Sequence, residues 1–148
     1  METMDHILLV EDDAHYAQLM QIGLEEAGVP NPVHVVSCGR EAIQYLAGEG
    51  PFSDRALYPE PALVLLDIEL PQQGGFEVLL WIRNQPRYRE LPVVMLSGLE
   101  VEWQVRQAQE FGATAYRVKP FAFNDLRNLV REISDRWLRA TAGAGHDA

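Results

Sequence analysis

The chain has 148 residues and a formal net charge of −10, with 47% hydrophobic and 23% charged residues. This length and composition are typical of one globular domain with one buried core, and no apolar run approaches the ~20 residues that a membrane helix needs. So acidic a chain, with no basic cluster, is not expected to bind nucleic acid. An acidic N-terminus without signal-peptide features and a single cysteine, Cys38, predict a cytoplasmic protein.

Five short apolar runs predict buried strands. The runs are continuous rather than alternating, which is typical of strands covered on both faces of a parallel sheet. They span residues 6–10, 33–36, 63–66, 93–96 and 115–118. Four of them lead directly into charged or hydroxyl side chains: the acidic turn 11–13, Asp67, Ser97 and Lys119.

Helical periodicity separates these strands. Apolar spacing predicts helices over 17–27, around 42–46, over 76–82, over 101–108 and from 126 to about Ala140. Asp12 or Asp13 would cap the first helix. Five strand–helix alternations predict a three-layer α/β sandwich with right-handed crossovers. We expect one domain over residues 1–140, a surface loop rich in Gly and Pro over 48–61, and a flexible tail over 141–148.

The polar groups at the strand ends suit one site. Ligands of open parallel sheets gather at the carboxyl ends of the strands, so Glu11, Asp12, Asp67, Ser97 and Lys119 should meet there. Carboxylates brought together repel one another unless a cation lies between them, and oxygen ligands alone favour Mg²⁺. Lys119 and Ser97 would then offer a charge and a hydrogen bond to a phosphoryl group, which predicts phosphoryl transfer.

These residues carry a resemblance to a known family. Residues 8–13 (LLVEDD), 65–71 (LLDIELP) and 75–79 (GFEVL), together with Ser97, Tyr116 and Lys119-Pro120, resemble the receiver domains of bacterial two-component response regulators. The resemblance covers nearly the whole chain. It implies a flavodoxin-like fold with a five-stranded parallel sheet in the order 2-1-3-4-5 and helices on both faces.

The resemblance also implies roles for individual residues. Asp67 would accept a phosphoryl group from a sensor histidine kinase, and Lys119 and Ser97 would stabilise that group. Ser97 and Tyr116 would act as the switch that remodels the surface of the fourth helix, fifth strand and fifth helix for a downstream protein. The implied Mg²⁺ ligands are Glu11, Asp12, Asp67 and the backbone carbonyl of Glu69. Such a protein catalyses only its own phosphorylation and dephosphorylation.

A narrower resemblance is to stand-alone receivers paired with phytochrome-type kinases. It rests on the 48–61 loop and on a last helix that ends in residues 133–138 (ISDRWL). In that subgroup the last helix helps to build a dimer, so Phe121, Phe123 and Trp137 are the predicted contacts of a homodimer.

Several readings stay open beside this one. An aspartyl-phosphate hydrolase of the haloacid dehalogenase type also places its nucleophile after an apolar strand, but it usually has an Asp where this chain has Glu69. A receiver-like interaction module would work without phosphorylation, although such domains generally lack an acid or the lysine. A flavodoxin-like FMN carrier would need a phosphate loop after the first strand, which is absent here.

Overall fold

The computed structural model describes residues 4–72 and 74–138, so the predicted tail at 141–148 lies outside the described residues. Strands and helices alternate along the chain, with two short 3-10 turns at Gly50–Phe52 and Pro86–Tyr88. The elements are β1 (Ile7–Val10), α1 (Ala14–Glu26), β2 (Val33–Val36), α2 (Gly39–Ala47), β3 (Leu63–Asp67), α3 (Gly75–Arg83), β4 (Val93–Ser97), α4 (Glu102–Glu110), β5 (Ala115–Val118) and α5 (Phe123–Trp137). No helix in these two ranges is long and apolar enough to cross a membrane.

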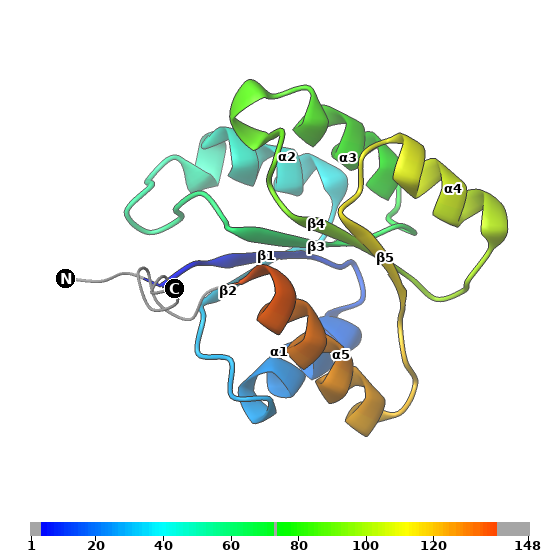
Figure 1. The fold of residues 1–148 in the computed structure, drawn as a ribbon. Coiled ribbons are helices and arrows are strands. Elements are labelled where there is room, and N and C mark those ends of the chain that lie inside the picture. Colours follow the sequence, from blue (N-terminus) through cyan, green and yellow to red (C-terminus); the bar gives the residue numbers. More distant parts are fainter. Residues whose placement is uncertain (1–3, 73, 139–148) are drawn as a thin grey trace.

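The sheet has five parallel strands in the order β2-β1-β3-β4-β5, which confirms the predicted topology. Helices α2, α3 and α4 cover one face, and α1 and α5 cover the other (Figure 1). Every residue of β1, β3 and β4 is buried, whereas most residues of the edge strands β2 and β5 are only partly buried. The continuous apolar runs therefore mark the central strands, as expected for a sheet covered on both sides.

Two hydrophobic cores share these strands because successive side chains point to opposite faces. In β1, Leu8 and Val10 face the core beneath α2, α3 and α4. Ile7 and Leu9 face the core beneath α1 and α5. With both faces occupied by apolar side chains, polar groups on the central strands are left to the strand ends.

The helix ends follow local chemistry. Asp13 caps α1 by accepting the backbone N–H groups of His15 and Tyr16 at 2.9 and 3.2 Å, so Asp13 rather than Asp12 is the cap. The expectation that α5 runs to about Ala140 is wrong. The helix ends at Trp137 because Leu138 takes an extended backbone conformation with φ −131° and ψ 142°.

The predicted surface loop over 48–61 is tied closely to the core. Phe52 and Tyr58 pack against the core beneath α2. The Arg55 guanidinium donates hydrogen bonds to the carbonyls of Tyr45 and Leu46, each at 2.7 Å. The last carbonyls of a helix have no partner within it, and Arg55 satisfies two of them beside the left-handed Gly48 that caps α2.

A histidine pair lies near the amino ends of β1 and β2. His6 Nδ1 is 2.8 Å from His34 Nε2, and the two rings are parallel within 8°. Burial lowers the pKa of both imidazoles, and although the neighbouring Asp5 raises that of His6, it does not reverse the shift. A hydrogen bond between two imidazoles needs one ring to accept, so the fully protonated pair loses it.

The pair should make the fold sensitive to acid. Because the folded-state pKa values lie below the ordinary value of about 6.5, the unfolded chain binds more protons, and stability is lost as the pH falls below about 6.5. Urea unfolding at pH 7.5 and 5.5 should show a smaller acid loss in His6→Gln/His34→Gln than in the wild type. The exposed His15→Gln is the matched control and should keep the wild-type pH dependence; an unchanged pH dependence in the double variant would contradict the prediction.

Candidate functional site

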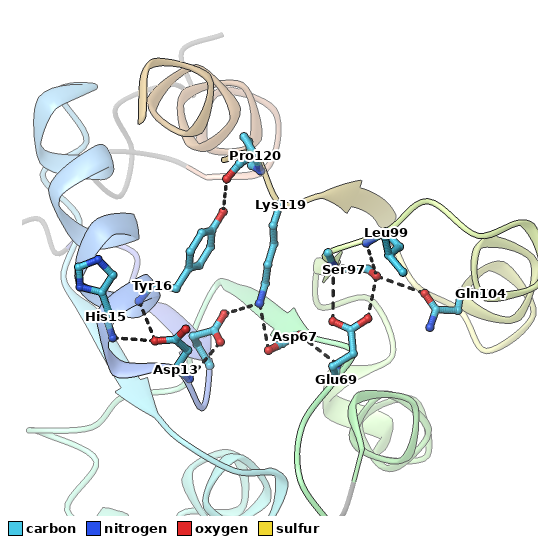
Figure 2. A network of polar contacts seen from close by, with 12 residues as sticks. Asp13, His15, Tyr16, Asp67, Glu69, Ser97, Leu99, Gln104, Lys119 and Pro120 are labelled. Carbon is cyan, nitrogen blue, oxygen red and sulfur yellow. Dashed lines mark hydrogen bonds and ion pairs between the residues drawn. The ribbon is translucent and has the colours of Figure 1, made fainter. Parts of the chain in front are cut away.

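The carboxyl ends of β1, β3, β4 and β5 bring Glu11, Asp67, Ser97 and Lys119 to one edge of the sheet. Lys119 extends its ammonium between two carboxylates, as Figure 2 shows for Asp67. Lys119 Nζ lies 2.8 Å from Glu11 Oε1 and 3.1 Å from Asp67 Oδ2. Both carboxyl side chains are almost completely buried.

Burial and charge shift the protonation of this cluster. Burial, with a smaller contribution from the neighbouring Asp67, raises the pKa of Glu11 to about 7, although Lys119 acts in the opposite direction. Burial disfavours the charged form of Lys119, but its ion pairs with Glu11 and Asp67 outweigh that effect and raise its pKa. The lysine therefore stays cationic at neutral pH, and its charge favours ionised partners.

One ammonium cannot neutralise the acids gathered here. Ligand oxygens of Glu11, Asp12 and Asp67 lie within 4.8 Å of one another, and this is the one such group among residues 4–72 and 74–138. A donor set of carboxylate oxygens without His or Cys fits a hard divalent cation such as Mg²⁺. The residues present therefore fit the metal that the sequence predicts, with Asp12 exposed and the other two buried.

Gly75 sets how closely α3 approaches the end of β3. A Cβ at this position would lie 2.9 Å from Ile68 Cα and closer still to the backbone carbonyl oxygen of Asp67. Real Cβ atoms essentially never approach backbone so closely. The Gly75 N–H also donates to the Ile68 carbonyl at 3.2 Å. Glycine is therefore required for the helix to start directly behind the Asp67 carboxylate.

Glu69 occupies the space between Asp67 and Ser97. Its backbone N–H donates to Asp67 Oδ1 at 3.0 Å, and its carboxylate Oε2 lies 3.0 Å from Ser97 Oγ. Ser97 Oγ is also 3.2 Å from Gln104 Oε1. A hydroxyl carries one proton, so Ser97 donates to one of these acceptors at a time. The predicted switch hydroxyl is thus engaged by an acid of this chain.

The predicted switch tyrosine joins the same network from β5. Tyr116 Oη lies 2.6 Å from the Leu99 carbonyl and 3.1 Å from Gln104 Oε1. Gln104 Oε1, which Figure 2 shows beside Ser97, therefore lies within hydrogen-bond distance of the hydroxyls of both Ser97 and Tyr116 at the start of α4. Ser97 and Tyr116 are coupled through a side chain that the sequence did not single out.

The three predicted dimer contacts do not form one patch. Phe121 is fully exposed in the turn before α5, and Phe123 is the first residue of that helix. Trp137 is the last residue of α5, about 20 Å away along the helix at 1.5 Å per residue. It also stacks beneath the guanidinium of Arg136 at 5.2 Å. Dimerisation through these residues stays a prediction.

Two residues of the site were missed from sequence. Tyr16 lies in the first turn of α1 and reaches Lys119 and the Pro120 carbonyl. Its position one helical turn after the acidic residues 11–13 was the available signal, because that end of α1 must face the site. Gln104 had no such signal, since a glutamine on a partly exposed helix is ordinary.

Comparison with known proteins decides the family. Residues 7–131 match the family described as the response regulator receiver domain. The chain belongs to this family. That membership removes the hydrolase and FMN-carrier readings and confirms the resemblance found in the sequence.

The receiver is similar to proteins of known name and structure. It is 37% identical over 133 residues to the "Probable methanogenesis regulatory protein FilR2" of Methanothrix harundinacea, covering 89% of this chain and 83% of that protein. It is 32% identical to the response regulator Rcp1 of Synechocystis, covering 89% and 88%. The crystal structure of the phosphorylated cyanobacterial phytochrome response regulator RcpA superposes with a TM-score of 0.83 at 32% identity, covering 91% of this receiver and 94% of RcpA.

In the absence of metal, removal of the Lys119 charge should destabilise the receiver. Lys119→Met leaves two buried carboxylates uncompensated, which we expect to lower the free energy of unfolding by about 3 kcal/mol at pH 8. Urea unfolding in a chelator measures the loss, and added Mg²⁺ should recover part of it. Arg131→Met, at an exposed position on α5, is the control. An equal loss in both variants would show that the Lys119 ion pairs do not hold the site together.

Crowding at Gly75 should be costly. Gly75→Ala forces the start of α3 away from the Asp67 carbonyl, with an expected loss of about 1–3 kcal/mol in unfolding free energy. Gly98→Ala is the matched control, because a Cβ there meets no atom within 4 Å. Thermal and urea unfolding measure both variants. An equal loss of unfolding free energy in the two would refute the steric requirement.

Proposed function

We propose that this receiver accepts a phosphoryl group from a histidine kinase onto Asp67 in a Mg²⁺-dependent reaction. The observation that supports the proposal best is the position of the Asp67 carboxylate. It is buried at the end of β3 and paired with Lys119. Its ligand oxygen lies within 4.8 Å of those of Glu11 and Asp12. A carboxylate held beside an ammonium at the end of a strand can act as a nucleophile.

In the proposed transfer, the phosphoryl group moves from a histidine nitrogen to an Asp67 oxygen. A carboxylate oxygen of Asp67 attacks the phosphorus of a phosphohistidine, the O–P bond forms and the P–N bond breaks. The bonding electron pair returns to the imidazole of the donor, and Asp67 becomes an acyl phosphate. Lys119 remains beside the new phosphoryl oxygens, where its fixed charge offsets the charge that accumulates on them.

The acidic residues would hold the metal. Glu11, Asp12 and Asp67 supply carboxylate oxygens, and the Glu69 carbonyl is the proposed fourth protein ligand. When bound, Mg²⁺ supplies positive charge that lowers the repulsion between the carboxylates and an incoming phosphoryl group. The Mn²⁺-bound structure of Rcp1, with a TM-score of 0.80 at 31% identity, supports this assignment.

Phosphorylation would then act on the network around Ser97. A phosphoryl group on Asp67 brings negative charge beside the Glu69 carboxylate, which weakens the contact between Glu69 and Ser97. Ser97 can then donate to a phosphoryl oxygen instead, and its departure alters the Gln104–Tyr116 contacts. This local charge change would bias the α4–β5–α5 surface between two arrangements.

The proposed partners follow from this chemistry and from the relatives. We assign the donor to a sensor histidine kinase of the phytochrome type, because RcpA is described as a phytochrome response regulator. The phosphorylated form would control a downstream protein in the cytoplasm through the α4–β5–α5 surface. A homodimer through Phe121, Phe123 and Trp137 is part of the same proposal.

Acetyl phosphate tests the acceptor directly. Wild-type protein incubated with acetyl phosphate and Mg²⁺ should gain the mass of one phosphoryl group, and a chelator should abolish the gain. Asp67→Asn should gain none because the amide cannot form the acyl phosphate. Intact mass spectrometry measures all three samples.

The exposed Asp125→Asn on α5 is the matched control and should be phosphorylated like the wild type. Phosphoryl uptake that persists in Asp67→Asn would move the acceptor elsewhere. A folded wild-type protein that gains no mass would favour the alternative, an interaction module that works without phosphorylation.

A further inference from the structure

Tyr16 lies against the lysine of the site. Lys119 Nζ is 5.0 Å from the centre of the Tyr16 ring. The Tyr16 hydroxyl donates a hydrogen bond to the Pro120 carbonyl at 3.1 Å. Figure 2 shows the ring extending from α1 toward Lys119, with its hydroxyl pointing at the turn that follows.

The turn that carries Lys119 is held by hydrogen bonds from two sides. The Lys119 N–H donates to the Ser97 carbonyl at 2.7 Å, which holds the start of the turn against β4. Phe121, two residues later, is fully exposed. The hydrogen bond from Tyr16 to Pro120 therefore anchors the turn on its other side, against α1. Lys119 lies between these two anchors.

The ring offers Lys119 a partner that carries no formal charge. Burial raises the pKa of Tyr16 to about 12, so the phenol is neutral at physiological pH. An aromatic face attracts an ammonium through its quadrupole, and the attraction grows when the cation is shielded from water. Glu11 and Asp67 have a second task as metal ligands, whereas Tyr16 is outside that group. The ring can thus hold the ammonium while the carboxylates change partners.

We propose that Tyr16 is a positioning residue that holds Lys119 toward Asp67 during phosphoryl transfer. This inference rests on the proposed function. It assigns no proton transfer or bond formation to Tyr16. The ring also packs against the core beneath α1 and α5, so a useful test separates positioning from packing.

The first experiment observes the contact itself. Lys119 is the only lysine of the chain, so labelling with ¹³C-lysine gives one set of side-chain NMR signals that needs no assignment. Protons of the Lys119 ε-methylene near the ring face should be shifted upfield in the wild type. Tyr16→Phe should keep most of this shift, and Tyr16→Leu should lose it.

The second experiment measures the phosphorylation rate with acetyl phosphate over a range of Mg²⁺ concentrations. Tyr16→Leu should lower the maximal rate roughly tenfold, the effect expected for a shielded cation–π contact. Tyr16→Phe should recover most of the rate because it keeps the ring. The Mg²⁺ concentration for half-maximal rate should stay within about twofold in both variants, since Tyr16 is no metal ligand; general damage to the site would change it. His15→Ala, at an exposed position that points away from Lys119 in Figure 2, is the control.

A wild-type rate in Tyr16→Leu would overturn the proposal, and so would a shift in Mg²⁺ dependence that accompanies the slower rate. An NMR signal of Lys119 that does not respond to Tyr16→Leu would overturn it as well. Failure of the proposed function and failure of the positioning role remain distinguishable. If wild-type protein takes up no phosphoryl group, the proposed function fails and the positioning role fails with it, while the NMR comparison still decides whether the contact exists.

Discussion

The site depends on one partly buried ammonium, that of Lys119, which two buried carboxylates share. Apolar side chains fill both faces of β1, β3 and β4. The carboxylates of Glu11 and Asp67 therefore lie at the carboxyl ends of these strands. Buried carboxylates are costly unless compensated, and Lys119 is the one lysine that the chain has. Its charge is too small for three acids, and this deficit makes the edge receptive to a divalent cation. The same deficit disfavours an added anion until such a cation has entered.

Glu69 holds the Ser97 hydroxyl, the proposed switch group of this receiver. Its carboxylate accepts from Ser97, while its backbone N–H holds Asp67. One residue therefore contacts both Asp67, the proposed acceptor, and Ser97, the proposed switch. A carboxylate and a phosphoryl group are both anionic acceptors, so they compete for the single proton of Ser97. In the proposed switch, the acceptor that Ser97 bonds would then be set by which of the two anionic groups is nearer and more charged.

The sequence predicted the fold and the principal acids because both follow from simple periodicity. Continuous apolar runs marked the central strands, and the residues that ended them, Asp67 and Lys119, had to meet at one edge. Contacts that depend on helix rotation and side-chain conformation were less accessible. Spacing along α4 does not show that Gln104 turns toward Ser97, nor does composition show that Arg55 in the 48–61 loop reaches back to α2. The extended backbone at Leu138, which ends α5, likewise had no local signal such as glycine or proline.

The guanidinium of Arg55 joins the 48–61 loop to the end of α2, nine and ten residues earlier in the chain. When the 48–61 loop lifts, the carbonyls of Tyr45 and Leu46 each lose the hydrogen bond from Arg55, although the Tyr88 hydroxyl still donates to Leu46. Helix and loop should therefore open together as one cooperative unit, with shared amide-exchange protection. The opposite edge of the molecule, at β5 and α4, has no such tie to the loop. We therefore expect the end of α2 and the 48–61 loop to open independently of the β5–α4 edge.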